Sequence, residues 1–228
     1  ARDFEAHVFT GADRVVVTTG RMRDAVIGRY GIEKSVVRVI PNFVDTARFQ
    51  PREPMDRRRL CFIGRLAEQK NLFALLEAIE GMEVELTVVG DGHLRPGLER
   101  MVREKNLPVR FLGSIPHGSL PDVLGECGIF VLPSLYEGHP KSLLEAMACG
   151  LPVIGANVPG IGDLLHHRET GYLCGTSPES IREALRTLSG DEDLCLRMGG
   201  AARQFITGSC TLDRVVEMEF GLLKELAS

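Results

Sequence analysis

Short runs of apolar residues alternate with longer amphipathic segments along most of this chain. The runs are rich in β-branched residues and almost continuous, which is typical of parallel strands buried on both faces. The segments between them have apolar residues at helical spacing. This alternation predicts an α/β fold with a doubly wound parallel sheet. The predicted strands are 14–18, 36–40, 60–63, 84–89, 109–112, 129–132 and 153–154, and the helices between them are 71–80, 94–105, 120–127 and 142–149.

The two ends of the chain depart from this alternation. From residue 178 onward the pattern is helical only, and it predicts helices at 178–188, 192–206 and 212–226. Residues 41–59 are rich in proline and charge, which predicts a linker or long loop. The segment before the linker, with two predicted strands and one helix, is too short to fold as a domain. We expect it to be the last piece of a preceding domain.

Composition and charge narrow the possible classes of protein. The chain has 228 residues, of which 44% are hydrophobic and 25% charged, as in ordinary globular domains. A formal net charge of −4 argues against nucleic-acid binding. The one basic run, 57–59, is interpreted as a solvated loop. No apolar stretch reaches the ~20 residues that a membrane span needs, and the first residues do not resemble a secretory signal.

The cysteines are interpreted as core residues rather than as a chemical site. No C-x-x-C pair occurs among the six, so neither a zinc site nor a redox site is expected. A chain of this length does not need disulfides to hold its core together. We expect reduced thiols in a cytoplasmic protein. The six are Cys61, Cys127, Cys149, Cys174, Cys195 and Cys210.

The loops that follow the predicted strands form the expected ligand-binding edge of the sheet. They collect glycine, serine, histidine and charged residues, and they span 64–71, 90–94, 113–119, 133–142 and 156–163. In the first loop Gly64 allows a close backbone turn, and Arg65 and Lys70 flank the start of a helix. A phosphate there would meet free amides, the helix dipole and two cations. A surface turn with solvated charges accounts for the same residues equally well.

Three other patterns give weaker indications. Residues 88–92 (VVGDG) resemble the start of a dinucleotide-binding G-x-G-x-x-G, but Arg95 stands where the third glycine belongs, so we favour a tight turn near a ligand. Asp191 and Asp193 have the D-x-D spacing of some metal sites, but they open a helix and are interpreted as its caps. No histidine pair has the spacing of a helical metal site. His139 alone is expected to contact a ligand.

The segment 136–150 (YEGHPKSLLEAMACG) places two carboxylates around a turn. Pro140 suits the first position of a helix, and the amides of 141–143 would then be free to bind a phosphate. Glu145 points away from the apolar face of that helix. It is either a solvated surface residue or an acceptor for hydroxyls such as those of a ribose. Glu137, at the turn, would then hold hydroxyls of a second sugar.

The motifs of the chain, taken in order, resemble those of one large family. The E-G-x-P-x-x-x-x-E pattern over 137–145 resembles the E-x7-E signature of retaining glycosyltransferases of the family 4 type (glycosyl transferases group 1), which have the GT-B fold. The ordered set covers almost the whole chain and is far more specific than any one segment. The other matching segments are 39–45 (VIPNFVD), 64–71 (GRL…KN), 86–92 (LTVVGDG), 109–113, 130–134 (FVLPS) and 146–153 (AMACGLPV).

The resemblance implies a Rossmann-like, C-terminal donor-binding domain for a nucleotide-diphosphate sugar, such as a UDP- or GDP-hexose, with no cofactor and no bound metal. Arg65 and Lys70 would bind the diphosphate and stabilise the leaving group. Glu137 would contact the transferred sugar, Glu145 the ribose, and 109–112 the base. The implied catalytic residues are Glu137, Arg65 and Lys70, and the implied donor-binding residues are Gly64, Arg65, Lys70, Gly90, Val109, Arg110, Leu112, Glu137, Gly138, His139, Pro140, Lys141, Ser142, Leu143 and Glu145.

The resemblance also implies a division into domains. Residues 1–44 would be the end of the N-terminal acceptor domain with the linker, 45–210 the donor domain, and 211–228 a C-terminal helix that packs back toward the acceptor domain. Two residues depart from the family pattern, since Phe43 replaces a linker glycine and Asp163 stands where the family has a glutamate. The rest of the acceptor domain is expected to lie outside this sequence, together with a histidine near the sugar and any peripheral membrane association.

The sequence therefore predicts the donor-binding half of a retaining, metal-independent hexosyltransferase, with little or no activity by itself. A non-catalytic nucleotide-sugar-binding subunit of a split glycosyltransferase fits the same residues, and an exposed apolar patch on the last helix would suit both. A sugar-nucleotide epimerase of the GT-B fold is the third possibility. The family-like linker and the GRL…KN segment argue against it.

Overall fold

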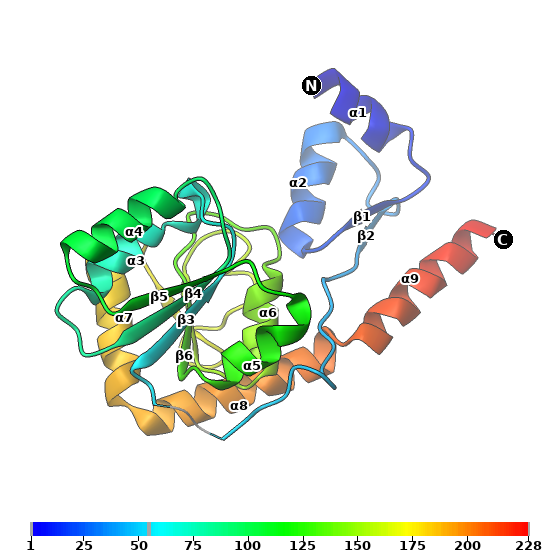
Figure 1. Ribbon diagram of the computed structural model, residues 1–228. Coiled ribbons are helices and arrows are strands. Elements are labelled where there is room, and N and C mark those ends of the chain that lie inside the picture. Colours follow the sequence, from blue (N-terminus) through cyan, green and yellow to red (C-terminus); the bar gives the residue numbers. More distant parts are fainter. Residues whose placement is uncertain (1, 54–55, 228) are drawn as a thin grey trace.

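The main body of the protein is a sheet of six parallel strands with helices on both faces (Figure 1). The structure, a computed structural model, describes residues 2–53 and 56–227, with side chains from residue 4 onward. The strand order is β5-β4-β3-β6-β7-β8, which confirms the predicted doubly wound sheet. The strands are β3 (Arg59–Ile63), β4 (Glu85–Val89), β5 (Val109–Gly113), β6 (Ile129–Leu132), β7 (Val153–Ala156) and β8 (Tyr172–Cys174).

The helices lie on the two faces of the sheet according to the direction in which the chain runs. It moves outward from β3 to β5, crosses back to β6 and then moves outward to β8. Because parallel crossovers are right-handed, the helices that connect β3 to β5 lie on one face, and those that connect β5 to β7 lie on the other. Helix α7 follows the last strand and returns to the first face. On one face α3 packs on α7, and on the other α6 packs on α8. The helices are α3 (Leu72–Ile79), α4 (Arg95–Glu104), α5 (Leu120–Gly125), α6 (Lys141–Ala148), α7 (Pro178–Gly190) and α8 (Glu192–Ser209).

Strands β3 and β6 are neighbours at the centre of the sheet, and the chain leaves them in opposite directions. This is the topological switch point, beyond which α/β sheets bind ligands. The loops that follow the two strands touch here. The Leu135 amide donates to the Gln69 carbonyl at 2.8 Å, and Gln69 Nε2 donates to the Tyr136 carbonyl at 2.7 Å. Two of the loops expected at the ligand edge therefore meet in space.

The first forty residues form a small separate unit (Figure 1). Its two strands pair in parallel, and its apolar cluster is distinct from the core of the main sheet. The strands and one helix match the prediction, whereas α1 was not predicted. The elements are α1 (Arg2–Thr10), β1 (Val15–Val17), α2 (Gly20–Tyr30) and β2 (Val37–Val39). The buried members of the cluster are Val15, Val17, Ile32 and Val37.

The segment that joins the two units is irregular, as its proline content predicts. Val44 forms a bridge with Thr211, just before α9 (Leu212–Ala227). Arg203 of α8 donates to the carbonyls of Phe49 at 2.5 Å and Thr46 at 3.1 Å. These contacts fix the linker to the C-terminal helices.

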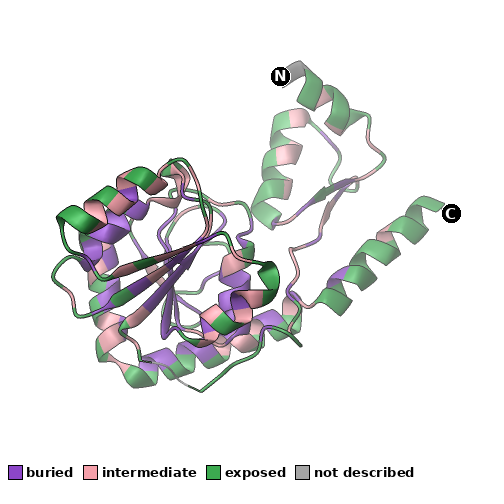
Figure 2. Cartoon of the chain, viewed as in Figure 1, coloured by how far each residue is buried: buried purple, intermediate pink, exposed green. Residues whose placement is uncertain are grey.

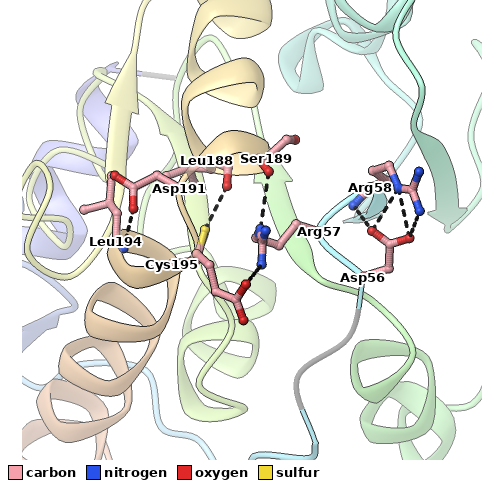
Figure 3. Close-up of polar contacts among 9 residues, drawn as sticks. Asp56, Arg57, Arg58, Leu188, Ser189, Asp191, Leu194 and Cys195 are labelled. Carbon is pink, nitrogen blue, oxygen red and sulfur yellow. Dashed lines mark hydrogen bonds and ion pairs between the residues drawn. The ribbon is translucent and has the colours of Figure 1, made fainter.

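The basic run 57–59 is solvated only in part, since Arg58 lies exposed in a turn whereas its two neighbours are half-buried. Arg57 Nε donates to the Ser189 carbonyl at 3.3 Å, and Nη1 of the same side chain lies 3.1 Å from Glu192 (Figure 3). Arg58 pairs with Asp56 at 2.8 Å, and residue 59 opens β3. The expectation of a solvated loop holds for Arg58 and not for Arg57, because the end of a helix offers carbonyls without an intrahelical partner, and the long Arg57 side chain reaches one of them.

The last helix extends away from the sheet with much of its apolar surface exposed (Figure 2). Val215 is buried, whereas its other large apolar residues are partly or fully exposed. Arg38 of β2 lies 3.2 Å from Glu225 of this helix. The last helix thus carries an exposed apolar patch of the kind that would suit both functional candidates. The exposed residues are Leu212, Val216, Met218, Phe220, Leu223 and Leu226.

Helix α8 begins at a side-chain cap rather than at a metal site. Asp191 Oδ1 accepts from the Leu194 amide at 2.9 Å (Figure 3). This bond satisfies one of the first amides of the helix, which have no intrahelical acceptor. Asp193 lies in the first turn and is exposed. The interpretation of Asp191 as a cap is confirmed.

We expect Asp191→Ala to lower the free energy of unfolding by about 1 kcal/mol, because the replacement removes the capping acceptor. Asp193→Ala is the matched control. It removes a carboxylate from the same turn but no capping bond, so its cost should not exceed about 0.5 kcal/mol. Urea denaturation of both variants measures the difference. Equal losses would show that the charge near the helix dipole, and not the cap, stabilises this terminus.

Candidate functional site

A lysine, a glutamate and a serine meet where the loops after β3 and β6 touch. Lys70 Nζ lies 2.5 Å from Glu137 Oε1, and Ser134 Oγ donates to the same oxygen at 2.7 Å. The side chains of Lys70 and Glu137 are only 15% and 7% exposed, so water screens their attraction weakly. Gly138, the next residue, is exposed. The structure thus places the expected diphosphate-binding cation against the expected sugar-binding carboxylate.

An asparagine fixes the position of Lys70. Lys70 ends a short 3₁₀ turn (Glu68–Lys70), and Asn71 follows with a left-handed φ of 55°. Asparagine tolerates this conformation better than most residues. Its side-chain amide donates to the carbonyls of Pro133 at 3.1 Å and Thr176 at 2.8 Å. Asn71 therefore ties the loop after β3 to the loop after β6.

The turn after β3 packs against the turn after β4. Gly90 has a φ of 125°, and a Cβ atom there would lie 2.0 Å from the Gly64 carbonyl oxygen. Only glycine fits this conformation and this contact. The tight turn predicted at 88–92 is confirmed. Arg65, which follows Gly64, is exposed beside this crossing.

The start of α6 differs from the prediction in two ways. Pro140 precedes the first helical residue instead of occupying that position, and the Leu143 amide donates to its carbonyl at 3.1 Å. Leu143 therefore has no free amide for a phosphate. The His139 ring is buried, and its Nδ1 accepts from the Asn42 amide at 3.3 Å. Burial lowers the pKa of His139 to about 4, so the ring is neutral, and its Nδ1 contacts the linker. A ligand contact by the rest of this ring stays a prediction.

Glu145 is not a surface residue. It is 2% exposed, and its Oε1 lies 2.7 Å from His117 Nε2. Burial raises the pKa of the Glu145 carboxyl, and the hydrogen bond with His117 opposes that shift. Sequence reasoning did not single out His117, although it lies in 113–119, one of the loops expected at the ligand edge. The carboxylate is therefore at the predicted edge but beneath an imidazole.

Two of the residues expected near the base lie at the wrong end of their strand. Val109 is the first residue of β5, and Arg110 follows it. Arg110 points to Glu126, at 3.8 Å, which also lies 3.8 Å from Arg59 at the start of β3. Successive strand residues advance about 3.3 Å, so only Leu112, half-buried near the end of β5, adjoins the ligand edge. We do not retain Val109 and Arg110 in the site.

The two residues that depart from the family pattern both make contacts. The Phe43 ring lies 4.5 Å from Lys141 Nζ, which is a cation–π distance. Asp163 accepts from the Gly160 amide at 3.2 Å and lies 3.1 Å from Arg21 Nε. Phe43 thus places an aromatic face beside the start of α6, and Asp163 links its loop to α2.

Other parts of the molecule do not add to this site. A cavity of about 270 Å³ lies at the opposite edge of the sheet, but Arg57 and Arg203 in its lining already bind backbone carbonyls. Within 2–53 and 56–227 no cluster of three or more histidine, cysteine or acidic residues could hold a metal ion. All six cysteines are buried and free, as expected. In the same ranges no helix is long and apolar enough to cross a membrane.

Sequence comparison places the chain among glycosyltransferases. The family described as glycosyl transferases group 1 matches residues 43–205, and the family described as Glycosyltransferase Family 4 matches 1–48. The phosphatidylinositol N-acetylglucosaminyltransferase GPI3 subunit of Saccharomyces cerevisiae is 30% identical over 77% of this chain and 42% of its own length. The glycogen synthase of Mycobacterium tuberculosis is 28% identical over 89% and 52%. The chain thus spans about half the length of these relatives.

Structural comparison agrees. Sucrose-phosphate synthase from Thermosynechococcus elongatus aligns with a TM-score of 0.89 and 26% identity, over 100% of this chain and 62% of its own. Anabaena HepE in complex with UDP aligns with a TM-score of 0.88 over 98% of this chain and 67% of its own, and at 19% identity it shows the shared fold. The chain therefore belongs to the glycosyl transferases group 1 family, and its parallel sheet is the Rossmann-like domain of a GT-B fold.

Proposed function

We propose that this chain is the donor-binding half of a retaining glycosyltransferase that moves a hexose from a nucleotide-diphosphate sugar to an acceptor without a bound metal. The observation that carries the proposal is the Lys70–Glu137 pair at the topological switch point. The similar Anabaena HepE binds UDP, alone and together with glucose, which supports a UDP-hexose. A GDP-hexose remains the other donor expected from the sequence.

The cations at this edge suit a leaving diphosphate. As the bond between the sugar and the diphosphate breaks, negative charge grows on the diphosphate oxygens, and cations already in place stabilise it. In our proposal Lys70, held by Glu137, supplies one positive charge, and the exposed guanidinium of Arg65 supplies a bidentate one. The amides of Lys141 and Ser142, at the start of α6, add partial positive charge.

The two glutamates would bind the two sugars of the donor. Glu137 Oε1 is occupied by Lys70 and Ser134, so Oε2 would accept a hydroxyl of the transferred hexose. Glu145 would accept the ribose hydroxyls. Lys70 would therefore lie between the diphosphate and the carboxylate that binds the hexose. The proposed site retains Gly64, Arg65, Lys70, Gly90, Leu112, Glu137, Gly138, Lys141, Ser142 and Glu145, with the backbone amide of His139; Pro140 has no amide, and its carbonyl already accepts from α6.

Calorimetric titration of the 228-residue chain with UDP, GDP, ADP and their hexose conjugates tests the proposal. We expect one nucleotide to bind and its hexose conjugate to bind at least as tightly. Glu145→Ala should abolish most of that binding, whereas Glu217→Ala, which changes an exposed glutamate of α9, should leave it unchanged. Absence of binding to every member of the panel would contradict the proposal.

One relative favours a second candidate function. The similar yeast protein is named as a subunit, which supports a nucleotide-sugar-binding subunit that completes a split enzyme. The two candidate functions predict different lengths for the native polypeptide. A single chain of about twice this mass in source cells, detected by an antibody against this sequence, would support one enzyme with two domains, because GT-B sites lie between two such domains. A short native chain would favour the subunit.

A further inference from the structure

His117 covers the buried carboxylate of the proposed donor site. It lies in a short 3₁₀ turn (His117–Ser119) after β5, and its Nε2 contacts Glu145 Oε1 at 2.7 Å. The Glu145 side chain is 3% exposed, whereas half of the His117 side chain, 51%, is exposed. The ring centre lies 5.5 Å from that of Phe49, which is fully buried. His117 thus stands between solvent and the carboxylate, braced by an aromatic ring from the linker.

Few charges compensate the buried carboxylate. His117 and Lys141 are the groups that favour its ionised form, and burial disfavours it. From α8, the guanidinium of Arg203 acts on Cys149, one turn beyond Glu145, and binds the Ala148 carbonyl at 2.5 Å. Burying an ionised carboxylate costs free energy unless it is hydrogen-bonded. The one hydrogen bond from another side chain to this carboxylate, in the described part of the chain, comes from His117.

We propose that His117 is a positioning residue, which keeps Glu145 ionised and oriented so that its free oxygen binds the ribose of the nucleotide donor. The proposal rests on the donor site described above and deepens it. The imidazole engages Oε1 only, and a carboxylate has a second oxygen that accepts hydroxyl protons. A ribose diol would bind an ionised carboxylate more strongly than a protonated one.

The sign of the pH dependence follows from the two opposing effects on Glu145. Burial raises the pKa of Glu145, and His117 lowers it. Removing His117 therefore raises this pKa further, and the carboxyl becomes protonated at a higher pH. Nucleotide binding, which uses the ionised form, should then fall off at a higher pH as the solution is acidified. At high pH the carboxyl is ionised in both proteins, and the difference should shrink.

Calorimetric titrations with UDP, GDP and ADP from about pH 5 to about pH 8 test this shift. We expect His117→Ala to weaken binding about tenfold at the acidic end and about twofold at the alkaline end. His117→Gln restores a neutral donor and should keep the wild-type pH profile. If the wild-type pH dependence of binding persists in His117→Gln, it does not arise from a charge on the histidine ring, because glutamine is neutral at every pH tested. Glu145→Gln should bind weakly at every pH, and adding His117→Ala to it should cost little more.

Each outcome bears on either the inference or the function beneath it. Unchanged or tighter binding of His117→Ala at all pH values would show that the ring only covers Glu145, and an equal loss at all pH values would show a merely structural role. Both overturn the inference. If nucleotide binding is lost in Lys70→Met but unchanged in the His117 and Glu145 variants, the proposed donor site stands and the inference about His117 is overturned. Failure of the wild-type chain to bind any of the three nucleotides overturns both.

Discussion

Lys70→Met should weaken binding of the nucleoside diphosphate about a hundredfold or more, the largest loss that we expect from a single side chain in the site. Methionine keeps the unbranched shape of lysine but removes its charge. The variant lacks a cation for the diphosphate, and it leaves Glu137, with its side chain 7% exposed, without its ion-pair partner. Breaking a buried pair on one side costs about 3–5 kcal/mol. The free energy of unfolding should therefore fall as well, as measured by urea denaturation.

A second substitution separates these two effects. In Lys70→Met/Glu137→Gln neither partner is charged, so much of the lost stability should return. Nucleotide binding should not return, because the cation is still missing. Lys105→Met is the matched control, since Lys105 pairs with Glu80 where both side chains are well exposed, and it should cost no more than about 1 kcal/mol. Recovery of binding in the double variant would show that Lys70 acts only through the structure.

The sheet could be predicted from the sequence because its central strands are short, apolar and bounded by glycine or proline. The one strand that was missed, β8, is three residues long, and only its last residue, Cys174, is buried. Its three residues are too short a run to distinguish a strand from a loop. Helix α1 was also missed. None of its described side chains is buried, so its sequence lacks the strong apolar periodicity that marks a packed helix. In both, the packing context and not the local sequence decides the structure.

The site could be predicted as a set of loops but not as a set of contacts. Glu137 and Lys70 are 67 positions apart, and Glu145 and His117 are 28 apart. No local pattern states which side chains will meet across strands. The sequence correctly places each of them beyond the end of a strand. It does not show that one carboxylate is paired with lysine and the other is covered by histidine.

Local reasoning also misses contacts that a residue makes with distant parts of the chain. His139 has the position of a ligand contact, but the linker residue Asn42 binds its Nδ1 at 3.3 Å and its carbonyl at 2.6 Å. Arg110 was assigned to the site together with the rest of β5. It pairs instead with Glu126, at the end of the sheet opposite the ligand edge. Sequence spacing identifies the strand, and only the register and the neighbours identify which of its residues adjoin the ligand edge.

Gly90→Ala should lower the free energy of unfolding by at least about 2 kcal/mol, because the site depends on two turns that cross without side chains. The new Cβ would lie 2.0 Å from the Gly64 carbonyl oxygen and 2.9 Å from its carbon. Both are backbone atoms, which cannot turn aside as the end of a side chain can. At a φ of 125° the alanine would be strained even in open space. Relief requires movement of the turn that carries Arg65, so nucleotide binding should weaken too.

Gly221→Ala is the matched control for this substitution. Gly221 lies inside α9, and a Cβ there would meet nothing within 4 Å. Alanine favours a helix over glycine by up to about 1 kcal/mol, so the control should be neutral or stabilising. Urea denaturation gives the stabilities of both variants, and calorimetry gives their nucleotide affinities. If Gly90→Ala were as stable as the wild type and bound nucleotide equally well, the crossing of the two turns would not be what positions Arg65, and the cationic edge would have to be held by the Asn71 and Lys70 contacts alone.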